Sequence, residues 1–137
     1  MNSDLSIRLR NSLGELKHLK EALRGYCEFR ELPSNAVFAL TLSLDEVVTN
    51  IISYGYDDRG EHYIDVTLRS GQGLIEVSVS DDGKPFNPLD FRTPDIRCPL
   101  DERPVGGLGI YLVKTYMSEL EYRREGVKNC LIMRKRY

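Results

Sequence analysis

Hydrophobic and polar residues alternate at the start of the chain and then recur at helical spacing. Leu5, Ile7 and Leu9 alternate with polar residues, which predicts a short strand with one buried face, suited to the edge of a sheet. After Ser12, a candidate N-cap, apolar residues follow three or four positions apart: Leu13, Leu16, Leu19, Leu23 and Tyr26. This spacing predicts an amphipathic helix that ends before Pro33.

The longest apolar segment lies in the following twenty residues. Starting at Ser34 or Asn35, apolar residues recur at helical spacing as far as Ile51. Gly55 and the polar segment 57–60 then break the pattern. We therefore expect a long helix that is largely buried.

The second half of the chain alternates strand patterns with one more helical pattern. We expect strands at 62–69 and 74–80 around a turn at 70–73, a helix over 107–117, and strands at 119–124 and 129–135 around a turn at 125–128. The segment 82–105 has no regular period and holds five of the six prolines. Long irregular segments in compact domains often cover a site, so we expect a lid at about 84–106.

Composition is that of an ordinary globular protein and limits the classes of function. The 137 residues suit a single domain, 1–137, and the formal net charge of -2 gives no sign of a nucleic-acid partner. Three cysteines without metal-ligand spacing fit a reducing cytoplasm, and the two histidines are interpreted as surface residues. No basic leader and no run of about 18 apolar residues is apparent, so neither export nor a membrane association is expected.

Two polar residues within the long apolar helix are the first candidates for chemistry. Glu46 and Asn50 are four residues apart, which places both side chains on one helical face. A carboxylate and an amide among apolar neighbours need either partners or a function. A polar stripe facing solvent explains the pair equally well when it is taken alone.

Two further motifs are ambiguous singly. Asp81 ends a predicted strand and Gly83 follows in a turn, a combination that often only shapes the turn. A Gly-Gly-Leu-Gly segment opens the predicted third helix, where glycines allow backbone N–H groups to approach a phosphate. The same cluster could be only a flexible joint, and it has neither Walker nor Rossmann spacing. Its members are Gly106, Gly107, Leu108 and Gly109.

The order of these motifs resembles the GHKL ATPase superfamily, and within it the bacterial anti-sigma-factor serine kinases. The resemblance rests on the segments 44–50 (LDEVVTN), 80–88 (SDDGKPFNP) and 103–110 (RPVGGLGI) and extends over essentially the whole chain. It implies the Bergerat fold, an α/β (α+β) two-layer sandwich with helices on one face of a mixed, mostly antiparallel sheet. It also implies ATP and Mg²⁺ as cofactors.

The resemblance assigns a role to each motif. Asn50 would bind Mg²⁺, and Asp81 would accept a hydrogen bond from the exocyclic amino group of adenine, which a guanine carbonyl cannot donate. Glu46 would be the general base of phosphoryl transfer. Arg103 is expected either at the terminal phosphate or in solvent. The remaining nucleotide-binding residues would be Gly83, Gly106, Gly107, Leu108 and Gly109.

Three functions stay open at the level of sequence. The first is an ATP-dependent protein serine/threonine kinase that binds a sigma factor or similar regulator and phosphorylates a small antagonist protein of the STAS type. The second is an ATP-binding interaction module without phosphate transfer. The third is a small ATP hydrolase, in which Glu46 would orient water. Glu46 favours the first function, because a pure binding module needs no general base. The resemblance also implies a homodimer, since relatives of this type are commonly homodimers.

Overall fold

The computed structural model describes residues 4–90 and 107–137, with the side chains of residues 107 and 108 excepted. In the described part, five strands form one sheet in the order β1-β2-β3-β5-β4. The strands are β1 (Leu5–Arg10), β2 (Tyr63–Gly71), β3 (Leu74–Asp81), β4 (Glu119–Glu125) and β5 (Lys128–Arg136). The strand predicted at 5–9 is confirmed, as is its place at an edge of the sheet.

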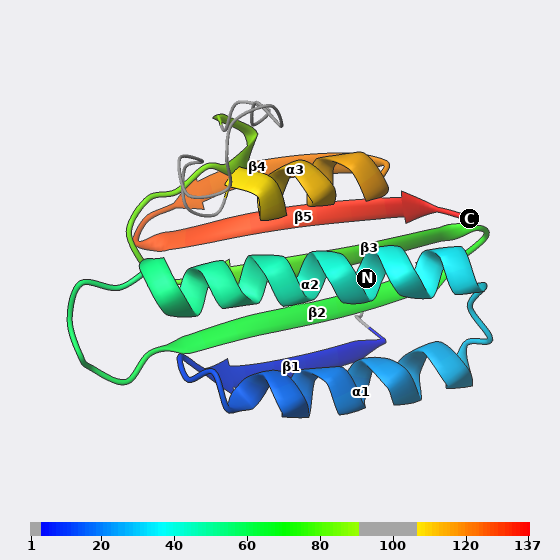
Figure 1. Cartoon of the computed structure of the whole chain (residues 1–137), viewed down its shortest axis with the longest axis horizontal. Helices are drawn as coiled ribbons and strands as arrows, with labels where there is room; N and C mark the ends of the chain where they lie inside the picture. Colours follow the sequence, from blue (N-terminus) through cyan, green and yellow to red (C-terminus); the bar gives the residue numbers. More distant parts are fainter. Residues whose placement is uncertain (1–3, 91–106) are drawn as a thin grey trace.

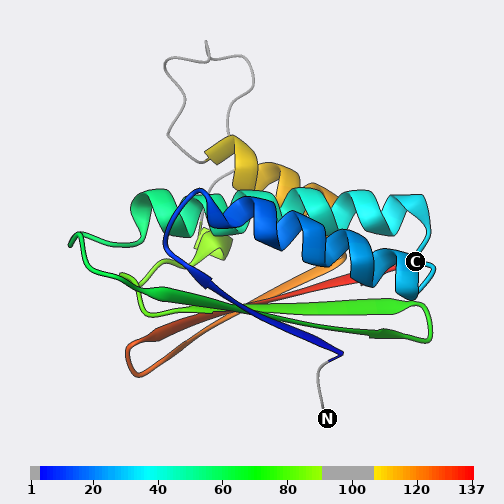
Figure 2. The same cartoon turned by 90° about the horizontal axis from the view of Figure 1, so that it is seen from below.

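The helices α1 (Glu15–Phe29), α2 (Ser34–Tyr54) and α3 (Gly107–Tyr116) cover one face of this sheet, with a short 3-10 turn, η1, at Pro88–Asp90 (Figure 1, Figure 2). The two-layer α+β sandwich is therefore confirmed. The sheet is antiparallel throughout rather than mixed, because successive elements reverse direction along the chain and every neighbouring strand pair is antiparallel.

Local sequence accounts for most of the boundaries. α2 begins at Ser34 after Pro33 and ends at Tyr54, with Gly55 as its C-cap, where the pattern was predicted to break. The β2–β3 turn has positive φ at Gln72 and Gly73, the conformation of a tight hairpin turn that glycine adopts without strain. The pattern thus placed both the long helix and this hairpin correctly.

The predicted N-cap of the first helix is wrong. α1 begins at Glu15, with Gly14 as N-cap and no side-chain cap bond. Ser12 instead forms a turn in which its carbonyl accepts the Glu15 amide, while the Glu15 carboxylate accepts the amide of Arg10 at 3.1 Å. Glu15 therefore ties the helix start to the end of β1, a tertiary contact that the local pattern could not show.

α2 is the central helix of the core. Its buried residues face the sheet: Ala36, Ala39, Leu40, Ser43, Leu44, Val47 and Val48. By length and composition alone this 21-residue helix could cross a membrane. The sequence had not suggested this, because its apolar residues do not form one long uninterrupted run. Core helices of water-soluble proteins meet the same criterion, and the apolar character of α2 is explained by its packing against β3, β5, α1 and α3.

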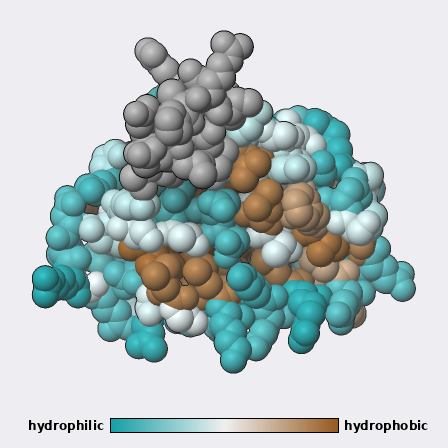
Figure 3. Space-filling model, in the orientation of Figure 1, coloured by the Kyte–Doolittle hydropathy of each residue, from teal (hydrophilic) through white to brown (hydrophobic). Residues whose placement is uncertain are grey.

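The outer surface of the helical layer is mixed in character. Seen from this side, hydrophobic side chains gather in patches among polar ones (Figure 3). Phe38 of α2 and Tyr116 of α3 contact edge to face, with ring centroids 5.1 Å apart, and both are exposed. The contact joins the first turns of α2 to the end of α3 and so helps to fix α3 beside the site described below.

Candidate nucleotide-binding site

A cavity of about 420 Å³ opens between α2, the ends of β3 and β5, and the segment that follows β3. Its walls are mainly apolar and include Val47, Ile51, Val79, Ile110 and Leu131. Polar residues that also line it include Asn50, Asp81, Lys84 and Asn129. An apolar cavity of this size with a few fixed polar groups is typical of a small-molecule site.

Asp81 is the principal buried polar residue of this cavity. It ends β3 and is 5% exposed, and its Oδ1 accepts hydrogen bonds from the Gly83 amide (2.8 Å) and the Asn129 Nδ2 (3.1 Å). Burial raises the pKa of the Asp81 carboxyl, and these two hydrogen bonds act against that rise. Within the described residues no hydrogen bond reaches Oδ2, so one carboxylate oxygen is available as an acceptor.

The turn after Asp81 requires glycine for a steric reason. A Cβ on Gly83 would lie 2.6 Å from the carbonyl oxygen of Gly55 and 2.9 Å from Asp81 Oδ1. The neighbouring Lys84 amide donates to the same Gly55 carbonyl at 2.9 Å. The C-terminal end of α2 and the Asp81–Lys84 turn are therefore in direct backbone contact, which brings Asn50 and Asp81 to one cavity.

Glu46 lies one helical turn before Asn50 but does not line the cavity itself. Its carboxylate faces the start of α3, where a Cβ on Gly109 would lie 2.3 Å from Glu46 Oε2. Burial, and to a lesser degree the neighbouring Asp45, raise the pKa of Glu46. Gly109 is thus needed to make room for Glu46, a function distinct from the predicted approach of backbone to nucleotide.

The structure brings together only part of the predicted site. Glu46, Asn50, Asp81, Gly83 and Gly109 surround or adjoin the cavity. Gly107 and Leu108 are described only as backbone of the first turn of α3. Arg103, Gly106 and most of the predicted lid at 84–106 lie outside the described residues. In the described portion of the lid, residues 84–90, the chain folds into η1.

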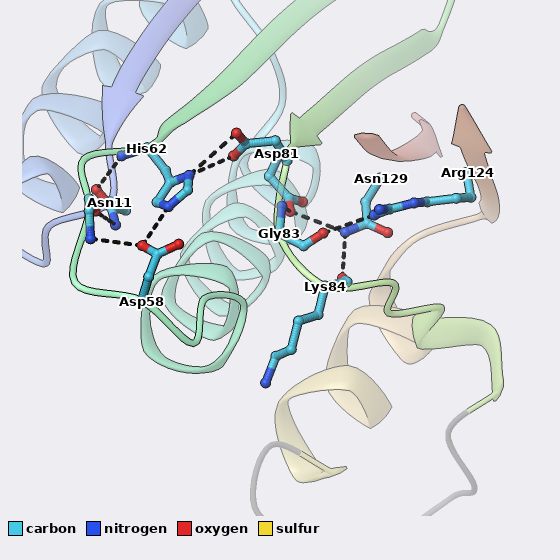
Figure 4. A network of polar contacts seen from close by, with 10 residues as sticks. Asn11, Asp58, His62, Asp81, Gly83, Lys84, Arg124 and Asn129 are labelled. Atoms are coloured by element: carbon cyan, nitrogen blue, oxygen red, sulfur yellow. Dashed lines mark hydrogen bonds and ion pairs between the residues drawn. The ribbon is translucent and has the colours of Figure 1, made fainter. Parts of the chain in front are cut away.

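Sequence reasoning missed the residues that hold Asp81 from the other side. Asn129 of β5 is buried and bonds to Asp81, and Arg124 of β4 donates to the Gly83 carbonyl at 2.9 Å (Figure 4). Asn129 is on the same face of β5 as the core residues Leu131 and Met133. A polar residue in the inward register of a strand was the available signal.

A second polar cluster lies beside the site, where His62 was expected on the surface. Its side chain is only 20% exposed. Nδ1 contacts Asp82 at 3.1 Å, Nε2 contacts Asp58 at 2.8 Å, and the ring stacks on Tyr56 at a centroid distance of 4.2 Å. The bond to Asp58, and then the one to Asp82, raise the pKa of His62, and burial raises that of Tyr56. His62 is therefore a partly buried residue at the surface, held by more contacts than a fully solvent-exposed histidine would make.

Comparison with known proteins agrees with this geometry. A family model described as the histidine kinase-like ATPase domain matches residues 9–135. The serine/threonine-protein kinase BtrW of Bordetella bronchiseptica is 30% identical over 96 residues, which cover 70% of this chain and 68% of BtrW. The serine-protein kinase RsbW of Bacillus mycoides is 30% identical over 87 residues, which cover 60% of this chain and 53% of RsbW.

Solved structures support the fold. The crystal structure of the RsbU and RsbW domains of Rv1364c from Mycobacterium tuberculosis matches with a TM-score of 0.68 and 17% identity, over 96% of this chain and 32% of that one. The histidine kinase domain of a blue-light activated histidine kinase from Erythrobacter litoralis matches with a TM-score of 0.51 and 20% identity. This match covers 76% of this chain and 46% of that one. The chain therefore spans about half of RsbW and a third of the mycobacterial chain.

The family match covers nearly the whole chain, and it includes every described residue of the cavity. The described residues of the three motifs recognised in the sequence lie on α2, at and after the end of β3, and at the start of α3. The chain therefore belongs to the histidine kinase-like ATPase family, and it is similar to the serine/threonine-protein kinase BtrW and the serine-protein kinase RsbW.

Proposed function

We propose that this protein is an ATP-dependent protein serine/threonine kinase of the anti-sigma-factor type. The observation that carries the proposal is the arrangement of two carboxylates around α2. Asp81 lies in the apolar cavity as an acceptor. Glu46 lies on α2 a helical turn before Asn50, and its carboxylate faces the start of α3. Such an arrangement separates a group that recognises a base from a group that moves a proton.

The residues present fit ATP. Adenine is flat and apolar on both faces, and the cavity offers Val79, Ile110 and Leu131 to contact it. The uncommitted Oδ2 of Asp81 would accept the exocyclic amino hydrogen of adenine. Guanine presents a carbonyl oxygen at that place, and two facing acceptors would cost roughly 1–3 kcal/mol. ATP is therefore the preferred nucleotide.

Asn50 would hold Mg²⁺ through its amide oxygen. Magnesium takes one or two protein oxygens and completes its shell with phosphate oxygens and water, so one amide on the cavity wall is a sufficient protein ligand. When bound, the ion neutralises charge on the phosphates during transfer. No further cluster of His, Cys, Asp and Glu suited to a metal occurs among the described residues.

Glu46 would be the general base. Burial raises the pKa of Glu46, which makes it a better proton acceptor than an exposed carboxylate. In the proposed reaction Glu46 takes the proton of an attacking serine or threonine hydroxyl as that oxygen bonds to the γ-phosphorus. The bond between that phosphorus and the β,γ-bridging oxygen breaks, and ADP leaves.

The proposed partners come from the relatives. BtrW is a serine/threonine-protein kinase and RsbW a serine-protein kinase. We propose a small STAS-type antagonist as the phosphate acceptor and a sigma factor or similar regulator as the bound partner. A homodimer, a cytoplasmic location, a single domain over residues 1–137 and a lid at 84–106 carrying Arg103 belong to the same proposal. Gly106, Gly107, Leu108 and Gly109 would contact the phosphates at the start of α3, where the helix dipole favours negative charge.

The test is transfer of labelled γ-phosphate from Mg-ATP to a purified STAS-type antagonist. Glu46→Gln keeps the size of the side chain and removes the base, and it is expected to lower the transfer rate by roughly 10²–10⁴-fold while Mg-ATP binding persists. Glu21→Gln is the matched control, because it makes the same chemical change at an exposed position of α1. Its rate should stay close to wild type.

Other results would favour the alternatives. Binding of Mg-ATP and of a regulator without label on any antagonist would indicate an interaction module. Release of labelled inorganic phosphate that is abolished by Glu46→Gln, with none on protein, would indicate a hydrolase. Equal transfer rates for wild type and Glu46→Gln would exclude Glu46 as the base.

A further inference from the structure

The side chain of Asn129 makes several hydrogen bonds at the wall of the cavity. Its Nδ2 donates to Asp81 Oδ1 at 3.1 Å and to the Lys84 carbonyl at 2.8 Å. Its Oδ1 accepts from the Phe86 amide at 3.3 Å and from the hydroxyl of Tyr122. Both amide hydrogens and both carbonyl lone pairs are therefore used (Figure 4 shows the first two contacts).

This set of partners fixes the orientation of the amide. A flipped Asn129 would point its carbonyl oxygen at the Asp81 carboxylate and at the Lys84 carbonyl, and its NH₂ group at the Phe86 amide. Each of those pairs would be two acceptors or two donors in contact. Because Asn129 is buried, water cannot compensate for such mismatches. The nitrogen is therefore held against Asp81.

The charge on Asp81 depends on the groups that face it from each neighbouring element. Arg124 of β4 favours the ionised carboxyl, whereas the adjacent Asp82 disfavours it. Tyr56, in the segment after α2, is close enough to interact with the Asp81 charge. Burial is the largest influence and raises the pKa of Asp81, and the bond from Asn129 is the largest influence that lowers it.

We propose that Asn129 is a positioning residue that holds Asp81 as an ionised, oriented acceptor and so sets the selectivity of the site for adenine over guanine. The inference rests on the proposed ATP-binding function. By occupying Oδ1, Asn129 leaves Oδ2 as the oxygen available to a base. If the Asp81 carboxyl could rotate, Oδ2 would no longer be held towards the base; if it took up a proton, its O–H could donate a hydrogen bond to the guanine carbonyl.

Two measurements on Asn129→Ala test the proposal. The first is the carboxyl-carbon NMR titration of Asp81 in the nucleotide-free protein, where loss of the Asn129 bond should raise the pKa of Asp81 relative to wild type. The second is calorimetric binding of Mg-ATP and Mg-GTP. We expect ATP binding to weaken by roughly 10- to 100-fold and GTP binding to change much less, so that selectivity falls.

Asn129→Asp supplies a variant of almost unchanged shape. Two carboxyl groups in buried contact share one proton, so this variant should bind Mg-ATP at low pH and lose affinity as pH rises through the pKa of the pair. Wild type should show no such loss over the same range. Asn35→Asp, at the exposed start of α2, makes the same chemical change far from the cavity and should match wild type.

The outcomes separate the two levels of the proposal. Failure of wild type to bind Mg-ATP would overturn the proposed function, while the titration of Asp81 would still decide whether Asn129 controls its charge. If wild type binds Mg-ATP, an unchanged pKa of Asp81 together with unchanged nucleotide selectivity in Asn129→Ala would overturn the inference. Circular dichroism of each variant confirms folding, and a pH-dependent affinity confined to Asn129→Asp is a result that a merely structural residue would not give.

Discussion

At the scale of single residues, the glycines of the site differ in what their missing side chains make possible. At Gly83 the nearest obstacle to a Cβ is the backbone carbonyl of Gly55, which cannot move without shifting the end of α2. At Gly109 the obstacle is the carboxylate of Glu46, the free end of a flexible side chain. At Gly25, in α1, nothing lies within 4 Å. Three similar substitutions should therefore have three different effects.

We predict that Gly83→Ala destabilises the fold by about 1–3 kcal/mol through overpacking, whereas Gly25→Ala stabilises it by roughly 0.5–1 kcal/mol through helix propensity. Gly109→Ala should change stability little and instead displace the Glu46 carboxylate, lowering phosphate transfer by roughly 100-fold. Urea unfolding and the transfer assay measure the two effects. Full transfer activity in Gly109→Ala would contradict the proposed position of the base.

At the scale of elements, the segment between α2 and β2 is tied to the end of β3 by His62. A protonated imidazole donates to both Asp58 and Asp82, whereas a neutral one has a single N–H and must face one carboxylate with a lone pair. The backbone amide of His62 donates a hydrogen bond to the side-chain Oδ1 of Asn11 at 2.9 Å. The connection next to the nucleotide site is therefore strongest when His62 is charged.

The pH dependence of this connection can be predicted in sign. Because the folded-state pKa of His62 is raised above its ordinary value of 6.5, its contribution to stability is complete below that value and is lost as pH rises through the folded pKa. Thermal stability of wild type should fall over that interval relative to His62→Gln. His18→Gln, which changes the other, exposed histidine, should retain the wild-type slope. Parallel curves of thermal stability against pH for wild type and His62→Gln would show that the charge on His62 does not stabilise this connection.

At the scale of the whole molecule, the cavity is assembled from parts of the fold that are distant in sequence. α2 supplies Asn50, the end of β3 supplies Asp81, and β5 supplies Asn129. A ligand that contacts all three binds only the folded chain, so its binding free energy adds to the free energy of unfolding. Ligand-induced stabilisation therefore reports on the site as a whole.

We predict that Mg-ATP at one hundred times its dissociation constant stabilises the protein by about 2.7 kcal/mol, and that GTP at the same concentration stabilises it less. Removal of magnesium with EDTA should reduce the effect of ATP in wild type. Asn50→Ala should show the smaller stabilisation with or without EDTA, because its magnesium ligand is missing. Thermal denaturation followed by circular dichroism measures each case. If EDTA reduced the ATP-induced stabilisation of Asn50→Ala as much as that of wild type, Asn50 would not be a magnesium ligand.

The sequence by itself determined the elements and the three motifs. Alternation and helical spacing are local consequences of one buried face, so the strands and α2 were predicted to within a few residues. The places of Glu46 and Asn50 on one helix, and of Asp81 at a strand end, followed from the same periodicity. Similarity of the ordered motifs to a family indicated the family, and through it the proposed function, which periodicity could not.

Only the tertiary structure decided which residues hold the motifs in place. Asn129 reaches Asp81 across 48 positions of sequence, and Gly109 accommodates Glu46 across the contact of α3 with α2. His62 becomes half-buried because Asp58, Asp82 and the ring of Tyr56 converge on it. Such contacts depend on strand register and on helix packing, and these are set by the summed burial of the whole core rather than by the residues near each partner.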